Sequence, residues 1–162
     1  MDQSRVRVPG AGPLDAELVF IGEAPAKNEL FEGKPFVGSA GRYLDKLFAI
    51  ASIIRDEVRL ENLSEVRAPG DKIERMPYDE IIYWEQDLIK RINALPNPKI
   101  LIPMGAYALR ALTDKKTITN FRGSPLKPKN AIKHDCIVIP TLHPSNMHYH
   151  YELWILIVAD LI

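Results

Sequence analysis

Four side chains that could carry chemistry are spread along the sequence: Glu23, Phe36, Asn62 and His143. A carboxylate such as Glu23 can orient or activate a water molecule, and the amide of Asn62 offers both a hydrogen-bond donor and an acceptor. The imidazole of His143 can stabilise negative charge that develops on a leaving group. Phe36 can stack on a flat ring. Each also has an alternative role, as an ordinary core aromatic for Phe36 and as a turn residue at a strand end for Asn62 and His143.

Phe36 belongs to a long connection, Gly22 to Gly41, which reads GEAPAKNELFEGKPFVGSAG. It follows an apolar run and leads into an amphipathic stretch, and its length far exceeds the ~2–6 residues usual between a strand and a helix. Loops of this length in small domains are usually functional or disordered, and we interpret this one as functional. Ligands of open α/β sheets bind at the carboxyl ends of strands, where this loop brings Glu23, Glu29 and Phe36.

The elements that must position these residues alternate along the chain. We expect strands at residues 17–21, 57–63, 99–104 and 136–140, and helices at residues 42–54, 78–95, 106–112 and 151–162. This order favours an α/β fold, a three-layer α/β/α sandwich with a central four-stranded parallel sheet. If the four strands share a direction, Glu23, Asn62, Gly105 and His143 meet at one edge of the sheet.

Length and composition indicate one ordinary globular domain spanning residues 1–162, with residues 1–16 as an arm that we expect to be poorly ordered. Lys and Arg balance Asp and Glu at 21 each, so no global basic field indicates a nucleic-acid partner. The single cysteine, Cys136, excludes an intramolecular disulfide and any cluster or zinc site built only from this chain's thiolates. No leader pattern or membrane-spanning run is seen, so we expect an intracellular protein of the cytoplasm or nucleoid with no membrane partner.

Several motifs occur in an order that carries a family resemblance. GEAP begins at Gly22, GKPFVGSAG at Gly33, an asparagine follows at the next strand end, and HPS begins at His143. This set resembles the uracil-DNA glycosylase superfamily and is most similar to its family 4, whose signature is roughly GEAPG, GxPFVGxAG, TNxxK and HPxxxL/R. The resemblance runs from about Pro13 to Ser145 and includes MGAYALRAL and RGSP.

The resemblance implies that these candidate side chains surround a slot for one flat, extruded base, and it gives each of them a role. Phe36 matches the phenylalanine that stacks on uracil, and Asn62 matches the asparagine that reads N3–H and O4. Glu23 lies in the water-binding catalytic loop, and His143 matches the histidine that hydrogen-bonds O2 of the leaving base. Other branches carry a water-positioning carboxylate where this chain has Ala24.

Further residues are expected around that slot. Glu29 lies near the C5 edge of the base, and an exposed loop carboxylate is an equal alternative for it. Ser39 and Ser145 can grip backbone phosphates by hydroxyl and N–H contacts. Met147 is the expected apolar wedge that fills the vacated base stack. Two histidines at i, i+2, His148 and His150, without a third ligand do not make a metal site.

Two departures from family 4 bear on cofactor and substrate. Its members hold an iron–sulfur cluster on four cysteines, whereas this chain has Val66 and Trp84 near two of those places and no cysteine in the amino-terminal arm. We therefore expect the cluster to be absent and no metal or organic cofactor to be needed. GEAPA replaces GEAPG, so Ala26 adds a methyl group beside the pocket, and uracil, a 5-substituted uracil and a deaminated purine all remain candidate bases.

The resulting hypothesis is a monofunctional DNA glycosylase that flips uracil or a related base out of DNA, hydrolyses its N-glycosidic bond and leaves an abasic site. We expect a monomer without lyase activity, since no lysine falls in a matched catalytic position. A second hypothesis is a non-catalytic descendant that binds DNA or a protein through the same surface. A small-molecule nucleotide enzyme ranks last, because the chain has no GxGxxG or Walker loop.

Overall fold

The computed structural model describes residues 6–162 and is built around one sheet of four parallel strands in the order β2-β1-β3-β4. The strands are β1 (Leu18–Gly22), β2 (Arg59–Asn62), β3 (Ile100–Pro103) and β4 (Ile137–Val138). All four share one direction, which confirms the prediction that their carboxyl ends meet at one edge of the sheet.

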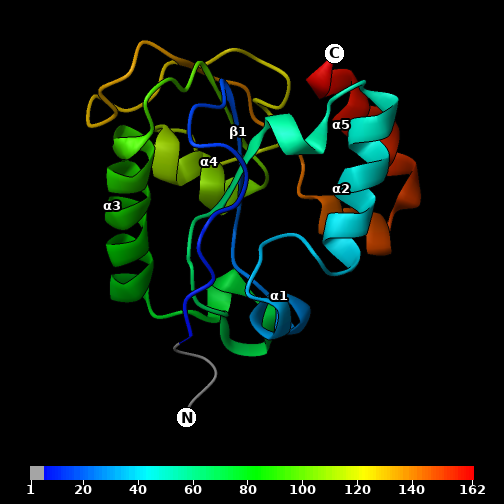
Figure 1. Ribbon diagram of the computed structural model, residues 1–162, viewed down its shortest axis with the longest axis horizontal. Helices are drawn as coiled ribbons and strands as arrows, with labels where there is room; N and C mark the ends of the chain where they lie inside the picture. Colours follow the sequence, from blue (N-terminus) through cyan, green and yellow to red (C-terminus); the bar gives the residue numbers. More distant parts are fainter. Residues whose placement is uncertain (1–5) are drawn as a thin grey trace.

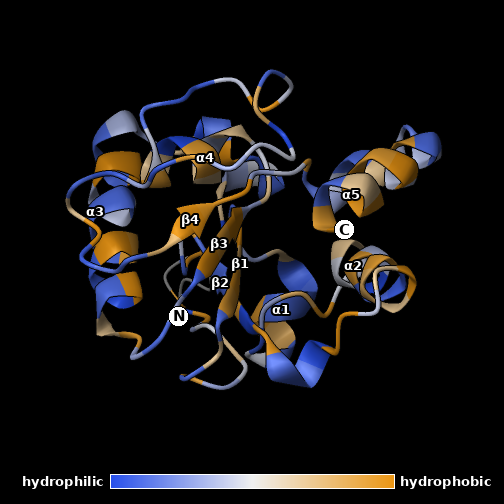
Figure 2. Cartoon of the chain, turned by 90° about the horizontal axis from the view of Figure 1, so that it is seen from above, coloured by the Kyte–Doolittle hydropathy of each residue, from blue (hydrophilic) through white to orange (hydrophobic). Residues whose placement is uncertain are grey.

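Helices cover both faces of this sheet, as the alternation of elements predicted (Figures 1 and 2). On one side lie α3 (Tyr78–Ala94) and α4 (Ala106–Leu112), and on the other lie α2 (Ser39–Ile50) and α5 (Trp154–Leu161). The fold is therefore the expected three-layer α/β/α sandwich. Within residues 6–162, no helix combines the length and apolarity that crossing a membrane requires.

The central strand β1 shows why the sequence folds this way. Successive strand side chains point to opposite faces of a sheet. Val19 and Ile21 pack with α3 and α4, whereas Phe20 packs on the other side with Leu44 and Phe48 of α2. All five side chains are at most 2% exposed. A strand buried on both faces must be apolar at every position, which explains the continuous apolar run.

Strand order places a topological switch point beside β1. The chain passes from β1 to β2 on one side, and then crosses β1 to form β3 and β4 on the other. Ligands of open α/β sheets bind at such a point, outside the carboxyl ends of the strands. Here those ends are Gly22 of β1 and, after β3, Gly105.

The structure differs from the predicted elements in several places. The long connection after β1 contains a short helix that the sequence analysis missed, α1 (Lys27–Glu32). The second strand begins at Arg59, because residues Arg55–Glu57 form a 3-10 turn. The last α-helix begins at Trp154, because residues Tyr151–Leu153 also form a 3-10 turn. The glycines and prolines of the first connection indicated an irregular loop, and a helix of only six residues is too short to give a clear periodic pattern.

The amino-terminal arm is not loose over the part that the structure describes. Ala11 pairs antiparallel with Leu60 on the outer edge of β2, exchanging two backbone hydrogen bonds of 2.8 and 2.9 Å. Val8 is 1% exposed and donates its N–H to the Glu65 carbonyl at 2.7 Å. The expectation of a poorly ordered arm is thus wrong for residues 6–16, and residues 1–5 lie outside the described part. At the opposite edge, Leu126 pairs antiparallel with Val138 of β4.

We predict that Gly12→Ala destabilises the protein more than Gly33→Ala. Both glycines have positive φ, +92° and +68°, where any other residue is strained by roughly 1–2 kcal/mol. A Cβ on Gly12 would also overlap the Val58 carbonyl, whereas one on Gly33 meets no atom within 4 Å. Urea unfolding should therefore show an additional loss of about 1–3 kcal/mol for Gly12→Ala. Equal losses would contradict the close approach of the arm to β2.

Candidate active site

The carboxyl edge of the sheet opens into a cavity of about 640 Å³, a size typical of small-molecule sites. The candidate residues from the sequence that line it are Glu23, Ala24, Glu29, Phe36, Ser39, Asn62, His143 and Ser145. These residues come from three separate segments of the chain: the long connection after β1, the end of β2 and the connection after β4. These eight candidate residues therefore converge on one cavity.

Gly22, the last residue of β1, is where Phe36 and Asn62 come together. In the sheet register Gly22 lies directly beside Asn62, the last residue of β2. A Cβ placed on Gly22 would lie 2.5 Å from Cζ of Phe36 and 2.6 Å from Oδ1 of Asn62. Only glycine leaves room for both groups. The ring and the amide are thus held at one place in the cavity.

Gly105 brings the other two candidates together in the same way. It follows β3 with φ of +97°, and a Cβ there would lie 2.6 Å from Oε1 of Glu23 and 3.5 Å from Cβ of His143. Because β1 and β3 are neighbours in the sheet, the Glu23–His143 pair lies next to the Phe36–Asn62 pair. All four side chains predicted to form the slot are therefore adjacent in the fold.

Phe36 is held in an unusual backbone conformation. Its φ is +56°, in the left-handed region that costs a non-glycine residue about 1–3 kcal/mol and persists only when the surroundings enforce it. The Phe36 carbonyl accepts a 2.8 Å hydrogen bond from Arg55, which also pairs with Asp45, and it packs against Gly41 in the first turn of α2. These contacts place the ring in the cavity and keep it 5% exposed.

Glu29 supports the same loop from the other end. Its carboxylate accepts hydrogen bonds from the backbone N–H groups of Ala26 (3.2 Å), Val37 (3.2 Å) and Gly38 (2.8 Å). It is 6% exposed, so the alternative of an exposed loop carboxylate is wrong. Through these hydrogen bonds Glu29 connects the start of α1 to the start of α2. Its predicted contact with the C5 edge of a base stays a prediction.

His143 is held as a neutral imidazole with a defined tautomer. Burial, together with the nearby His148, lowers the pKa of His143 to about 4. The backbone N–H of Ser145 donates to Nδ1 at 3.1 Å, and the Ser145 hydroxyl lies 2.7 Å from the same nitrogen. Since Nδ1 accepts, the ring proton of the neutral form resides on Nε2. Nε2–H is then the hydrogen-bond donor that His143 has available.

The pKa of Glu23 is shifted in the opposite direction, upward. Burial, reinforced by the negative charge of Glu74, raises the pKa of Glu23 to about 7, although a backbone hydrogen bond from Tyr107 acts in the other direction. A carboxyl with a pKa near 7 can take up or release a proton at neutral pH, which suits a general base. The site thus contains an acid poised near neutrality and a histidine kept uncharged.

The prediction that Met147 is the wedge residue is wrong. Its side chain is 3% exposed and packs with Leu47, Leu142 and Ile157 between α2 and α5, so it cannot enter a base stack. Met147 lies in the short 3-10 turn Pro144–His148, which directs it inward. Tyr149, two residues later, lines the cavity and is 88% exposed.

The cavity wall includes residues that sequence reasoning missed. Lys27 and Asn28 come from the unrecognised helix α1, and Gly70 to Glu74 come from two 3-10 turns after β2. The only available signal was the long polar connection after a strand end, which indicated a surface loop without specifying its position. Ser39 was expected at the site, but its partner was not: its hydroxyl lies 3.1 Å from Nε2 of His148.

The residues near the expected cluster positions do not fit an iron–sulfur cluster. Val66 and Trp84 are 5% and 4% exposed and belong to the apolar core, and the Arg7 guanidinium lies 5.1 Å from the Trp84 ring centre. None of these side chains offers a thiolate. Within residues 6–162, no group of three or more His, Cys, Asp or Glu side chains is arranged to hold a metal ion.

We predict that Glu23→Gln stabilises the protein at pH 8 and not at pH 5. The folded-state pKa of about 7 lies above the unfolded value of about 4.5, so folding favours the protonated carboxyl, and stability falls as the pH rises through this window. Glutamine removes that loss, which is on the order of 3–4 kcal/mol because the two pKa values differ by about 2.5 and one pKa unit is about 1.4 kcal/mol. Thermal unfolding at both pH values checks this, and Glu32→Gln, an exposed position at the end of α1, corrects for the removed charge. An equal effect at both pH values would contradict the burial of Glu23.

Comparison with known proteins relates this sequence to a family. The family model described as "Uracil DNA glycosylase superfamily" matches residues 9–159. The chain is 35% identical over 152 residues to a type-4 uracil-DNA glycosylase of Sulfurisphaera tokodaii, covering 90% of this chain and 67% of the relative. It is 36% identical to proteins of the same name from Saccharolobus solfataricus, covering 88% and 67%, and Thermotoga maritima, covering 85% and 69%. Because the family model matches nearly the whole of this chain, the chain belongs to the uracil-DNA glycosylase superfamily.

Proposed function

We propose that this chain is a monofunctional DNA glycosylase that hydrolyses the N-glycosidic bond of uracil, or of a related base, after the base is flipped out of DNA. We further propose that it acts as a single-domain monomer inside the cell. The observation that carries the proposal is the convergence of Glu23, Phe36, Asn62 and His143 on one cavity around two glycines. The family membership and the names of the relatives point to the same chemistry.

Recognition of the base rests on Phe36 and Asn62. An enzyme that acts on an extruded base holds it by stacking and by hydrogen bonds to its Watson–Crick edge. Phe36 supplies a rigidly held ring face, and Asn62 is 4% exposed at the neighbouring position beside Gly22. Its amide can accept from N3–H and donate to O4, a pattern that uracil presents and cytosine does not.

Departure of the base leaves negative charge on the ring, which His143 can stabilise through Nε2–H to O2. A neutral donor suits this task, because its proton stays on nitrogen while the hydrogen bond strengthens as charge develops. Preorganised donors of this kind are usually the largest single contribution to such a reaction. The contact of Nδ1 with Ser145 fixes the ring orientation before substrate arrives.

The water that completes the reaction is assigned to Glu23. As the bond between C1′ and the base nitrogen breaks, the electron pair leaves with the base and the sugar carbon becomes electron-poor. The water oxygen bonds to C1′, and its proton passes to the Glu23 carboxylate. The released base anion takes up a proton from solvent, and the sugar remains in the strand as an abasic site.

Contacts to the DNA strand are assigned to the rim of the cavity. Ser39 and Ala40 lie at the amino end of α2, a twelve-residue helix whose first N–H groups can meet a phosphate, and Ser145 offers a hydroxyl nearby. Exposed Tyr149 takes the wedge position that buried Met147 cannot occupy. No residue in these contacts reads sequence, so the enzyme is expected to act in any sequence context.

Base release from oligonucleotides tests the proposal. A panel with uracil, hydroxymethyluracil or hypoxanthine is read for abasic sites by alkaline cleavage. We expect release of uracil or a related base, about 10²–10³-fold slower with His143→Ala and roughly 5–150-fold slower with Phe36→Ala, since one base stack is worth ~1–3 kcal/mol. Tyr83→Ala, a half-exposed aromatic on α3, is the matched control. No release from any substrate with intact DNA binding would favour the non-catalytic alternative.

The pH dependence of base release should follow Glu23 and not His143. A base must be deprotonated, so the single-turnover rate is expected to rise with pH up to about 7 and then level off. His143, with its pKa of about 4, stays neutral over this range, so it adds no second pH-dependent change to the rate profile. Glu23→Gln should lower the plateau about 10²–10⁴-fold and abolish the rise. A rise that persists in this variant would remove Glu23 from the catalytic step.

A further inference from the structure

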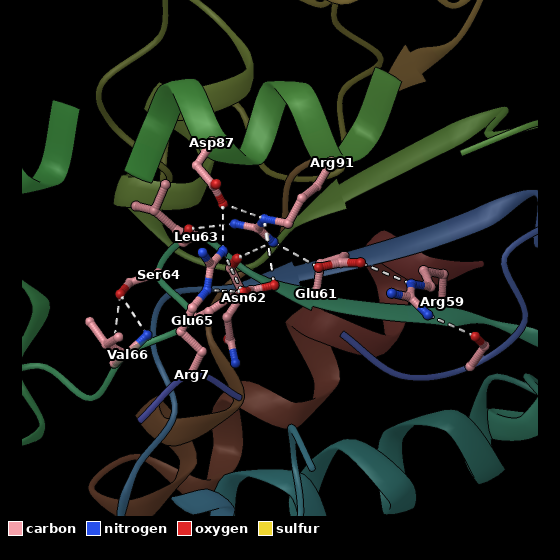
Figure 3. Close-up of polar contacts among 11 residues, drawn as sticks. Arg7, Arg59, Glu61, Asn62, Leu63, Ser64, Glu65, Val66, Asp87 and Arg91 are labelled. Carbon is pink, nitrogen blue, oxygen red and sulfur yellow. Dashed lines mark hydrogen bonds and ion pairs between the residues drawn. The ribbon is translucent and has the colours of Figure 1, made fainter. Parts of the chain in front are cut away.

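Behind the Asn62 side of the cavity lies a network of six charged side chains. It contains three arginines and three acids, so its formal charges cancel, and its members come from the amino-terminal arm, β2 with its exit loop, and α3 (Figure 3). The members are Arg7, Arg59, Glu61, Glu65, Asp87 and Arg91. Neither the motifs nor the proposed chemistry accounts for this network.

Arg91 is the centre of the network. Its Nη1 donates to Glu61 at 2.7 Å and to the Asn62 carbonyl at 3.0 Å, and its Nη2 donates to the Leu63 carbonyl at 2.9 Å. Its Nε donates to Asp87 at 2.7 Å, one turn earlier in α3. One guanidinium therefore donates to two consecutive backbone carbonyls, those of Asn62 and Leu63, at the end of β2, as Figure 3 shows.

The same strand end is tied to β1 on its other side. The N–H of Leu63 donates to the Gly22 carbonyl at 2.8 Å, and the N–H of Ser64 donates to the Glu23 carbonyl at 2.9 Å. Asn62 thus lies on a backbone that is fixed from both directions, by the end of β1 and by Arg91. Its amide has little freedom to shift relative to Phe36 and Glu23.

The remaining members attach the arm to this unit. Arg7 donates to Glu65 at 2.7 Å and lies 5.1 Å from the centre of the Trp84 ring, while Arg59 donates to Glu61 and to the Gly12 carbonyl. Glu61 is 2% exposed and accepts from Arg59 and Arg91 on separate oxygens. Buried charges persist only when paired and hydrogen-bonded, so Arg91 is needed to compensate Glu61 as well.

We infer that Arg91 is a positioning residue for base recognition: it fixes the Asn62–Leu63 backbone so that the Asn62 amide meets the base edge. This inference rests on the proposed function. A planar guanidinium reaches four acceptors in fixed directions, whereas a lysine ammonium is a point charge with three donors and cannot reproduce the fork. Replacing Arg91 should therefore disturb the backbone at Asn62 even when the charge is kept.

The experiment compares Arg91→Lys and Arg91→Met with two controls. Lys90→Met removes a positive charge from the adjacent, exposed position of α3. Glu65→Gln weakens the attachment of Arg7 and the 3.7 Å ion pair of Glu65 with Nε of Arg91, but it leaves the hydrogen bonds from Arg91 to the two carbonyls in place. All variants are compared well below their unfolding temperatures, and Arg91→Lys keeps a folded representative if Arg91→Met unfolds.

Two readouts are made on each protein. Hydrogen exchange at the Leu63 and Ser64 amides is expected to accelerate at least tenfold in both Arg91 variants and to stay within twofold of wild type in both controls. The single-turnover rate of uracil release is expected to fall at least tenfold in the Arg91 variants, with the dissociation constant for uracil-free DNA changed less than twofold.

The outcomes separate the inference from the proposed function. Unchanged exchange at Leu63 and Ser64, or a lowered melting temperature with a wild-type release rate, overturns the positioning role of Arg91. Accelerated exchange in the Arg91 variants together with a wild-type protein that releases no base refutes the proposed function, but it leaves the hold of Arg91 on the strand end established.

Discussion

The structure depends on the absence of a side chain at two neighbouring strand ends. Gly22 closes β1 and Gly105 follows β3. A methyl group at Gly22 would overlap both Phe36 and Asn62, and one at Gly105 would overlap Glu23. Because the strands are parallel and adjacent, the two approaches share one edge of the sheet. The cavity is therefore formed by backbone geometry first, and the connections then supply the side chains that fill its walls.

Burial in this cavity separates the behaviour of two titratable groups. Desolvation disfavours the charged form of any side chain, so it raises the pKa of the Glu23 carboxyl and lowers that of the His143 imidazole. One environment thereby yields a proton acceptor active near neutrality and a hydrogen-bond donor that keeps its proton. Groups whose pKa values are shifted in this manner are a common mark of catalytic sites.

Sequence reasoning reached the sheet and most of the site because both leave local patterns. Apolar runs marked the four strands, and ordered motifs marked Glu23, Phe36, Asn62 and His143. It failed where the deciding contact lies far along the chain. Met147 packs in one apolar cluster with Leu47 of α2, and Ala11 of the arm pairs with Leu60 of β2; neither contact is visible in the local sequence. The sequence does not show that Arg91 contacts the site, because Asn62 lies 29 positions away.

The pairing of residue 11 with β2 and of residue 126 with β4 has a consequence for the behaviour of many copies together. Both outer strands of the sheet already have a backbone neighbour within the chain. An outer strand with unpaired N–H and C=O groups is a template on which further chains can stack into fibrils. Here the two flanking segments pair with Leu60 and Val138, so each outer strand offers a shorter template to another chain than its length would suggest.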